Sequence, residues 1–191
     1  MNIRTGTTFA LLATLAGSAL AQVNVAAAVN GGVATQSSDW SAIATADRAN
    51  DGVREGDYYQ PTSIAHTNSE AGAWWEADFA GASAIDSVNV FNRTDGLSQR
   101  INDFNVYLYL GDEIVYSATD VTFDEEITGA QLSGMTFATG GVVADRVRIQ
   151  LSGFNYLQLA EVEAYSAVPE PASMVALGLG ALALLRRRRS Q

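Results

Sequence analysis

The stretch Phe104-Asn105-Val106-Tyr107-Leu108-Tyr109-Leu110 alternates between apolar and more polar side chains. Successive side chains of a β-strand point to opposite faces, so this alternation predicts a strand. Its core-facing side would carry Phe104, Val106, Leu108 and Leu110. This is the clearest strand pattern in the chain, and it sets the expected architecture.

The same kind of pattern continues on both sides of this stretch. From Val23 onward, apolar residues alternate or form short runs between clusters of Gly, Asn, Asp and Ser, which is typical of many short strands. No stretch between Gln22 and Tyr165 has a convincing helical period. Further strands are expected at residues 74–79, 85–91, 114–118, 142–151 and 157–165. The sequence therefore predicts an all-β domain, built as a sandwich or jelly roll.

Composition excludes several kinds of site. The 191 residues contain no cysteine, which removes disulfides, thiol nucleophiles and thiolate metal sites. Lysine is also absent, and six arginines face twenty acidic residues between positions 22 and 167. Such a negative field repels nucleic acid and anionic lipid, whereas a neutral ligand or a cation such as calcium remains compatible. Once both ends are set aside, about 145 residues remain, enough for one domain with its own core.

The N-terminal end has the composition of a targeting segment. Arg4 is followed by an apolar run from Thr8 to Ala16 and by the small-x-small sequence Ala19-Leu20-Ala21. This order predicts a signal peptide over residues 1–21, which signal peptidase would cleave after Ala21. The alternative is a buried N-terminal helix, which the short apolar run makes less favourable.

The C-terminal end carries a second targeting pattern. Val168-Pro169-Glu170-Pro171-Ala172-Ser173 precedes an apolar run, Met174–Leu185, and then Arg186–Arg189. The run is short for a bilayer span, and the arginines would stay on the cytoplasmic side. The string resembles the PEP-CTERM sorting signal of Gram-negative bacteria. That resemblance implies transient membrane insertion, recognition by an exosortase and cleavage near the Pro-Glu-Pro, whereas the alternative is a plain membrane anchor. The chain is thus divided into residues 1–21, a domain over 22–166 and a sorting signal with a short apolar helix over 167–191.

Four residues of the domain have the chemistry of a sugar site. A guanidinium is a planar fork of donors that can hold two neighbouring oxygens, such as vicinal sugar hydroxyls, and Arg93 and Arg100 supply two such forks. His66, the one histidine of the chain, can donate to a hydroxyl or accept from it. Asp95 lies between the arginines in sequence and could orient them. Together these residue types indicate a sugar-binding face.

The spacing of these residues adds a family resemblance. Twenty-six residues separate His66 from Arg93, one separates Arg93 from Asp95, and four separate Asp95 from Arg100. This resembles the His, Arg, Asp, Arg motif of F-type lectins (fucolectins). Landmarks of the wider discoidin-like superfamily cover nearly all of the domain: Asn24-Val25-Ala26, Ala34-Thr35-Gln36-Ser37-Ser38, Ala49-Asn50-Asp51-Gly52, Trp74-Trp75-Glu76-Ala77-Asp78-Phe79 and Glu161-Val162-Glu163-Ala164-Tyr165. The resemblance implies an eight-stranded jelly-roll β-sandwich with its ligand loops at one end.

The resemblance implies that His66, Arg93 and Arg100 hydrogen-bond the hydroxyls and ring oxygen of α-L-fucose. Other roles stay open for each residue. His66 could be a buried histidine bonded to a backbone carbonyl, and the arginines could form ordinary surface ion pairs, which contribute little. Trp74 and Trp75 could offer a stacking face to a sugar, but large aromatics on a strand usually pack in a core.

The resemblance also places supporting residues around the sugar. Tyr59 stands where the family has an aromatic against the C6 methyl group of fucose, with Tyr58 as the neighbouring alternative and a core role open for either. Family members often have a vicinal disulfide just after the motif aspartate. This chain has Gly96-Leu97 there, so Leu97 is expected to provide the apolar contact instead.

A calcium site is the last feature that the resemblance implies. Calcium takes about six to eight oxygen ligands from carboxylates and carbonyls. The matching positions are the side chains of Asp51, Glu161 and Ser63 and the backbone carbonyls of Arg48 and Val53. The alternative is that Asp51 only caps a turn.

Taken together, these features predict an exported, non-catalytic carbohydrate-binding protein at the surface or in the matrix of a Gram-negative bacterium. Its partner would be a fucosylated glycan or an exopolysaccharide, and several copies or a homo-oligomer would compensate for weak single sites. The alternative is a discoidin-like adhesion module that binds a protein or an exopolysaccharide without fucose specificity. A small glycoside hydrolase is less favoured, because no nucleophile or carboxylate pair is placed around a pocket.

Overall fold

The computed structural model describes residues 22–60, 63–123 and 134–167. The expected signal peptide (1–21) and the apolar helix of the sorting signal lie outside these ranges. Within the described ranges, no helix has both the length and the apolar character needed to cross a bilayer.

The described chain forms short and long β-strands with three short 3-10 helices, which confirms the all-β class. In chain order the elements are β1 (Gln22–Asn24), η1 (Ala28–Asn30), β2 (Val33–Gln36), η2 (Ala46–Ala49), β3 (Ala65–His66), β4 (Glu70–Ala71), β5 (Trp74–Asn92), η3 (Ser98–Ile101), β6 (Phe104–Leu110), β7 (Glu113–Val121), β8 (Gly134–Leu151), β9 (Phe154–Asn155) and β10 (Gln158–Ala167). Eight of the strands belong to one hydrogen-bonded sheet, and β4 and β9 form a separate pair.

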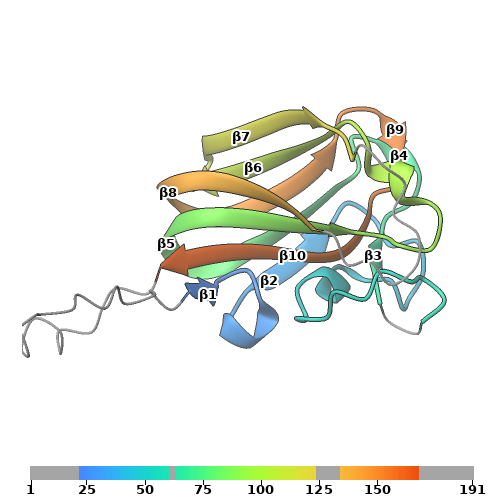
Figure 1. The fold of residues 1–191 in the computed structure, drawn as a ribbon, viewed down its shortest axis with the longest axis horizontal. Helices are drawn as coiled ribbons and strands as arrows, with labels where there is room; N and C mark the ends of the chain where they lie inside the picture. Colours follow the sequence, from blue (N-terminus) through green and yellow to red (C-terminus); the bar gives the residue numbers. More distant parts are fainter. Residues whose placement is uncertain (1–21, 61–62, 124–133, 168–191) are drawn as a thin grey trace, which may run out of the picture.

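Two long strands, β5 and β8, connect the two layers of the sandwich (Figure 1). The nineteen residues of β5 would span roughly 60 Å if straight, at about 3.3 Å per residue, which exceeds the diameter of a compact domain of this size. Register shifts between Asp78 and Ser83 and between Ile85 and Ser87 mark the place where β5 bends beside β8. Strands that pass from one layer to the other through such irregularities form the corners of sandwiches.

The first layer contains β2, β6 and β7 together with residues 74–78 of β5 and 146–151 of β8. The second layer contains β1, β3 and β10 together with the later part of β5, and residues 134–138 of β8 pair with it. The core lies between the layers. Its largest members are at most 1% exposed and include Trp75, Ile85, Phe104, Ile149 and Leu159.

The strand predictions agree with the structure in position but not always in length. The 104–110 strand is confirmed as β6, and Phe104, Val106 and Leu108 are fully buried. Leu110 is 41% exposed, because it is the last residue of the strand and lies beyond the core. The expected strands 74–79 and 85–91 are a single bent strand, since pairing with β8 resumes after the polar and small residues of the bend. β8 begins at Gly134 rather than at Val142.

The tryptophan pair has two different roles. Trp75 is fully buried, and its indole Nε1 donates to the carbonyl oxygen of Ala46 at 2.8 Å, so the expected core role is confirmed for this residue. Trp74 points to the opposite face and is half-buried, because neighbouring side chains of a strand alternate.

The two ends of the described chain lie together. Gln22 pairs with Ala167 in antiparallel register. Figure 1 shows β1 and the end of β10 at one end of the molecule, and β3, β4 and β9 at the other. Because β10 begins at Gln158 beside β3 and ends at Ala167, it runs the length of the sandwich from the loop-rich end to the chain ends.

Candidate functional site

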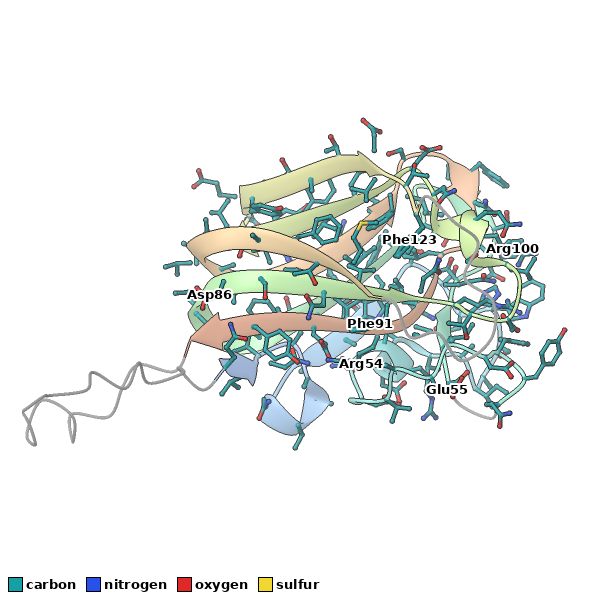
Figure 2. The ribbon with its side chains drawn as sticks, viewed as in Figure 1. Arg54, Glu55, Asp86, Phe91, Arg100 and Phe123 are labelled. Atoms are coloured by element: carbon teal, nitrogen blue, oxygen red, sulfur yellow. The ribbon has the colours of Figure 1, made fainter. Side chains whose placement is uncertain are left out.

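Four polar side chains from separate segments meet at the loop-rich end. His66 ends β3, Arg93 directly follows β5, Arg100 lies in η3, and Gln158 begins β10. Figure 2 shows Arg100 near β4 and β9, at the end of the molecule opposite Asp86. We call His66, Arg93, Arg100 and Gln158 the His66 cluster.

The Gln158 side-chain oxygen is the common point of this cluster. It lies 2.5 Å from His66 Nε2, 3.0 Å from Arg93 Nη1 and 3.1 Å from Arg100 Nη1. The amide is assigned with its oxygen at this point because two guanidinium N–H groups reach the same atom, and an NH2 group there would face only donors. The imidazole and both guanidinium groups therefore converge on a single acceptor.

His66 is held as a neutral imidazole between two positive charges. Burial lowers the pKa of His66 to about 4, and the charges of Arg93 and Arg100 act in the same direction. A neutral imidazole carries one N–H, yet Nδ1 lies 2.7 Å from the carbonyl oxygen of Thr67 while Nε2 faces the Gln158 oxygen. One of the two ring nitrogens therefore has no hydrogen to donate to the acceptor that it faces. A hydroxyl placed at Nε2 would remove this conflict, because it can donate and accept.

Asp95 pairs with Arg93, one of the two arginines that it was expected to orient. The Arg93 guanidinium donates to both carboxylate oxygens of Asp95, through Nε to Oδ1 and through Nη2 to Oδ2, the latter at 2.7 Å. The pair is buried, with 5% and 11% of the two side chains exposed, so Arg93 is not an ordinary surface ion-pair residue. Gly96 follows with φ at +94°, a backbone conformation that favours glycine and turns the chain after Asp95.

Aromatic rings form a wall around the imidazole. Trp40 stacks on His66 with ring centroids 5.4 Å apart, and Tyr58 and Tyr156 approach the imidazole edge-on at 5.7 and 5.5 Å. The Arg100 guanidinium lies 4.8 Å from the Tyr156 ring centroid. We call Trp40, Tyr58 and Tyr156 the aromatic wall. It offers apolar ring surface beside the polar cluster, the combination that ligand sites usually have.

Three of the four residues of the His66 cluster are buried. His66 is 3% exposed, Arg93 4% and Gln158 1%, whereas Arg100 is half-buried. Trp40 is 47% exposed. Solvent therefore reaches this region mainly beside Arg100 and Trp40.

The expected supporting residues differ in how closely they approach the His66 cluster. Tyr58 contacts the cluster, since the Arg93 guanidinium lies 4.9 Å from its ring centroid. Tyr59 is 80% exposed and packs edge-on against Tyr58 at 5.8 Å. Leu97 is half-buried at the start of η3, the helix that carries Arg100.

Sequence reasoning missed Gln158, Trp40 and Tyr156. Gln158 interrupts the apolar run of residues 157–160, and a buried amide in such a run needs polar partners. The sequence therefore indicated that Gln158 needs polar partners, but it did not indicate which residues these are. Trp40 and Tyr156 reach His66 only through the folding of the loops before η2 and between β9 and β10.

The expected calcium ligands show one strongly perturbed carboxyl group. Burial raises the pKa of Glu161 to about 8, and the nearby charge of Asp51 adds to the shift. Glu161 Oε1 accepts the Gly52 N–H at 3.1 Å, while Oε2 is buried and has no hydrogen-bond partner among the described residues. Partial burial also raises the pKa of Asp51.

The other expected ligand, Ser63, has its hydroxyl bonded to the carbonyl oxygen of Asp57. Among the residues that the structure describes, no group of three or more His, Cys, Asp or Glu side chains is placed to hold a metal ion. The expected set has only two carboxylates, with the remaining oxygens coming from serine and the backbone. The orphaned Oε2 of buried Glu161 fits a cation at this position.

A β-sandwich that gathers guanidinium groups, an imidazole and aromatic rings in its loops has the architecture of a carbohydrate-binding module. The F5/F8 type C family described as a NedA-like, galactose-binding domain matches residues 48–149, somewhat over half of the chain. Fucolectin-6 of Anguilla japonica is 31% identical over 147 residues, covering 72% of this chain and 74% of that protein. The chain belongs to the F-type lectin (fucolectin) family of the discoidin-like superfamily.

Solved structures agree with this assignment. A fucose-binding module of Streptococcus pneumoniae, SpX-3, superposes with a TM-score of 0.66 at 27% identity, over 76% of this chain and 99% of that chain. The lectin domain of lectinolysin complexed with Lewis B antigen has a TM-score of 0.66 at 28% identity, over 76% of this chain and 98% of that chain. The PEP-CTERM protein-sorting motif matches residues 167–189, so the chain also carries a bacterial export and sorting signal.

Proposed function

We propose that this protein is a non-catalytic lectin that binds L-fucose, or a glycan containing a related sugar, at the His66 cluster. The observation that carries the proposal is the convergence of His66, Arg93 and Arg100 on the Gln158 oxygen. A sugar hydroxyl that replaced the Gln158 oxygen, with the amide turned away, could accept from the arginines and donate to His66 Nε2, which the Gln158 oxygen cannot do. The related proteins named for fucose binding support this choice of sugar.

The aromatic wall supports the same ligand class. A sugar presents apolar C–H surface as well as hydroxyls, and fucose adds a C6 methyl group whose burial contributes about 0.8 kcal/mol. Tyr58 and Tyr156 both approach the imidazole edge-on, each with an arginine over its ring. Ring faces and fixed donors in one place suit a ligand that is apolar on one side and polar on the other.

A glycan array competed with free L-fucose tests the proposal. The full-length protein should bind fucosylated glycans, and Arg100→Ala should lose that binding without loss of fold, because Arg100 is half-buried and Arg93 keeps its partner Asp95. Arg54→Gln is the matched control, since Arg54 pairs with Glu163 outside the cluster. A folded protein that binds no glycan on the array would contradict the proposal.

A second candidate is an adhesion module that binds a protein or an exopolysaccharide without fucose specificity. The burial of His66 and Arg93 favours it, because Arg93 already pairs with Asp95 and His66 Nδ1 already lies against the Thr67 carbonyl. For an adhesion module, binding to its protein or exopolysaccharide ligand should survive the double change His66→Ala and Arg100→Ala. For a lectin that binds sugar at the His66 cluster, the same double change should abolish binding.

We further propose a structural calcium ion held by Asp51 and Glu161, with Ser63 and the backbone carbonyls of Arg48 and Val53 completing the oxygen set. The ion would supply the positive charge that the buried Glu161 carboxylate lacks. Glu161 lies three residues beyond Gln158 on β10, so the same strand would carry both the calcium ligand and the centre of the sugar site.

We also propose that the domain is exported and displayed outside the cell. Signal peptidase would remove residues 1–21, and an exosortase would act near the Pro-Glu-Pro sequence, leaving the domain outside a Gram-negative cell. The described chain ends at Ala167, at the end of the sandwich opposite the His66 cluster (Figure 1). An attached tail would therefore present the sugar site away from its point of attachment, and display of several copies, or a homo-oligomer, would strengthen binding.

A further inference from the structure

The outward face of the first layer carries three cross-strand rows of polar and aromatic side chains. Taken from β5, β8 and β6 in turn, the rows are Trp74, Gln150 and Asn105, then Glu76, Arg148 and Tyr107, then Asp78, Arg146 and Tyr109. Residues two apart on a strand are roughly 6.6 Å apart along it. The rows therefore form a patch about 13 Å long and about 10 Å wide, at about 4.8 Å between strands, which we call the β5-β8-β6 strip.

The arginines of the strip are held down against the sheet. The Arg148 guanidinium lies 4.4 Å from the Trp74 ring centroid, and its Nη2 lies 2.6 Å from Glu76 Oε2. The Arg146 guanidinium lies 4.6 Å from the Tyr109 ring centroid. Each arginine side chain is 24% exposed, so both are ordered but still reachable. A ligand would therefore meet donors whose side-chain entropy is already lost on folding.

A cavity of about 340 Å³ lies at the end of the strip where β5 bends. It is lined by Asp78, Phe79, Gly111, Asp112, Asp145 and Arg146. Its walls are braced, because the Gly111 N–H donates to Asp145 at 2.9 Å and Arg146 donates to the Gly111 carbonyl at 3.0 Å. A volume in this range is typical of small-ligand sites, roughly 300–1,000 Å³. Asp78 and Arg146 belong to both the strip and the cavity, so the two features are continuous.

Charge decides which ligand fits this surface. Glu76, Asp78, Asp112 and Asp145 outnumber Arg146 and Arg148, so an anionic polymer would be repelled. Carboxylates accept from hydroxyls, guanidinium groups donate to them, and the rings of Trp74, Tyr107 and Tyr109 offer apolar contact. We propose that the strip and its cavity form a second glycan-binding surface, which takes an extended, uncharged polysaccharide chain.

This site is separate from the His66 cluster. The strip uses the outward side chains of the first layer, and its cavity lies at the bend of β5, away from β3 and from the start of β10. The strip and its adjoining cavity share Asp78 and Arg146 and so offer one surface to several sugar units, whereas the cluster is a point of convergence for one sugar. The proposal therefore stands even if the His66 cluster binds no fucose.

Native affinity electrophoresis of the full-length protein tests the second site. Gels would contain a neutral glucan, a galactan or a mannan, with free L-fucose at saturating concentration to occupy the His66 cluster. We expect retardation in at least one neutral gel and none in polygalacturonate. The double change Tyr107→Ala and Arg146→Gln should weaken binding to that polysaccharide at least tenfold, as should the single change Asp145→Asn. Phe154→Ala removes an aromatic that is 72% exposed outside the strip and should leave retardation unchanged.

Several outcomes would overturn the proposal. These are migration unaffected by all three neutral polysaccharides, retardation abolished by L-fucose, or retardation that survives both strip variants when circular dichroism shows them folded. Equal retardation in polygalacturonate would contradict the charge argument. Light scattering that reveals a dimer broken by Tyr107→Ala, with no polysaccharide bound, would assign the face to a second copy of the chain instead.

Discussion

Gln158 and His66 lie directly opposite each other in the antiparallel pairing of β10 with β3, and their side chains meet at 2.5 Å. This pairing places an amide oxygen within reach of Arg93, which directly follows β5, and of Arg100 in η3. The His66 cluster therefore depends on strand register, because a shift of one residue would turn Gln158 to the other face of the sheet.

Replacing Gln158 separates its structural role from its effect on binding. Gln158→Leu leaves a buried N–H group of Arg93 without its acceptor, which costs about 1–3 kcal/mol, and removes the same acceptor from half-buried Arg100. Gln158→Glu keeps an acceptor and adds a charge that attracts both arginines, so it should retain stability but weaken glycan binding. Urea unfolding and glycan titration measure the two effects. Unchanged unfolding of Gln158→Leu would show that the oxygen is not the common acceptor.

The single histidine allows its pKa to be measured without ambiguity. An NMR titration of the imidazole should give a pKa near 4. Trp40→Ala should raise it toward the ordinary value of about 6.5, because Trp40 covers one face of the ring. Tyr59→Ala should leave it unchanged, since Tyr59 contacts Tyr58 and is itself largely exposed. An ordinary pKa in the wild-type protein would contradict the buried, neutral state of His66.

Glycan binding should depend on pH with a low midpoint. The folded-state pKa of His66 lies below its unfolded value, so the unfolded chain takes up the proton first as the pH falls. The stability contributed by neutral His66 is complete above about pH 6.5 and is lost as the pH approaches 4. Affinity for fucosylated glycans should therefore stay constant from pH 8 to about pH 6 and fall toward pH 4. A midpoint near pH 6.5 would show that an exposed imidazole does the binding.

Glu161 should make the metal-free protein less stable as the pH rises. Its folded-state pKa of about 8 lies above the ordinary value of 4.5 for a glutamate side chain, so between these values the folded state holds the proton more tightly. Stability should fall through this window by up to about 1.4 kcal/mol per pH unit. Calcium should reverse the loss by binding the ionised carboxylate, and Glu161→Gln should remove both the slope and the calcium effect. Melting curves with calcium or EDTA at pH 5 and pH 8 measure this.

The adjacent tryptophans should respond very differently to the same substitution. Trp75→Phe leaves the Ala46 carbonyl without its donor and opens space in the core, so it should cost about 1–3 kcal/mol. Trp74→Phe changes a half-buried outer residue and should cost less than about 1 kcal/mol. Urea unfolding of the two variants provides a matched comparison. Equal losses would place both indoles in the core.

Some features of the cluster could be predicted from the sequence because they are local. Arg93 and Asp95 are two residues apart, and the orientation of one by the other follows from that short distance along the chain. The alternation of residues 104–110 likewise predicted that Phe104, Val106 and Leu108 are buried. Leu110 did not follow the pattern, because the core ends before the strand does.

Sequence alone determined the all-β class, the chemistry of His66, Arg93 and Arg100, and the resemblance to F-type lectins, since residue type, periodicity and spacing are properties of the linear chain. Tertiary structure decided that β5 is one strand bent between two layers, that Gln158 is the shared acceptor, and that Trp40 stacks on the imidazole. The physical reason is that long-range pairing sets register and burial. These two quantities determine which polar atoms meet and how far the pKa of His66 falls, and no local pattern contains them.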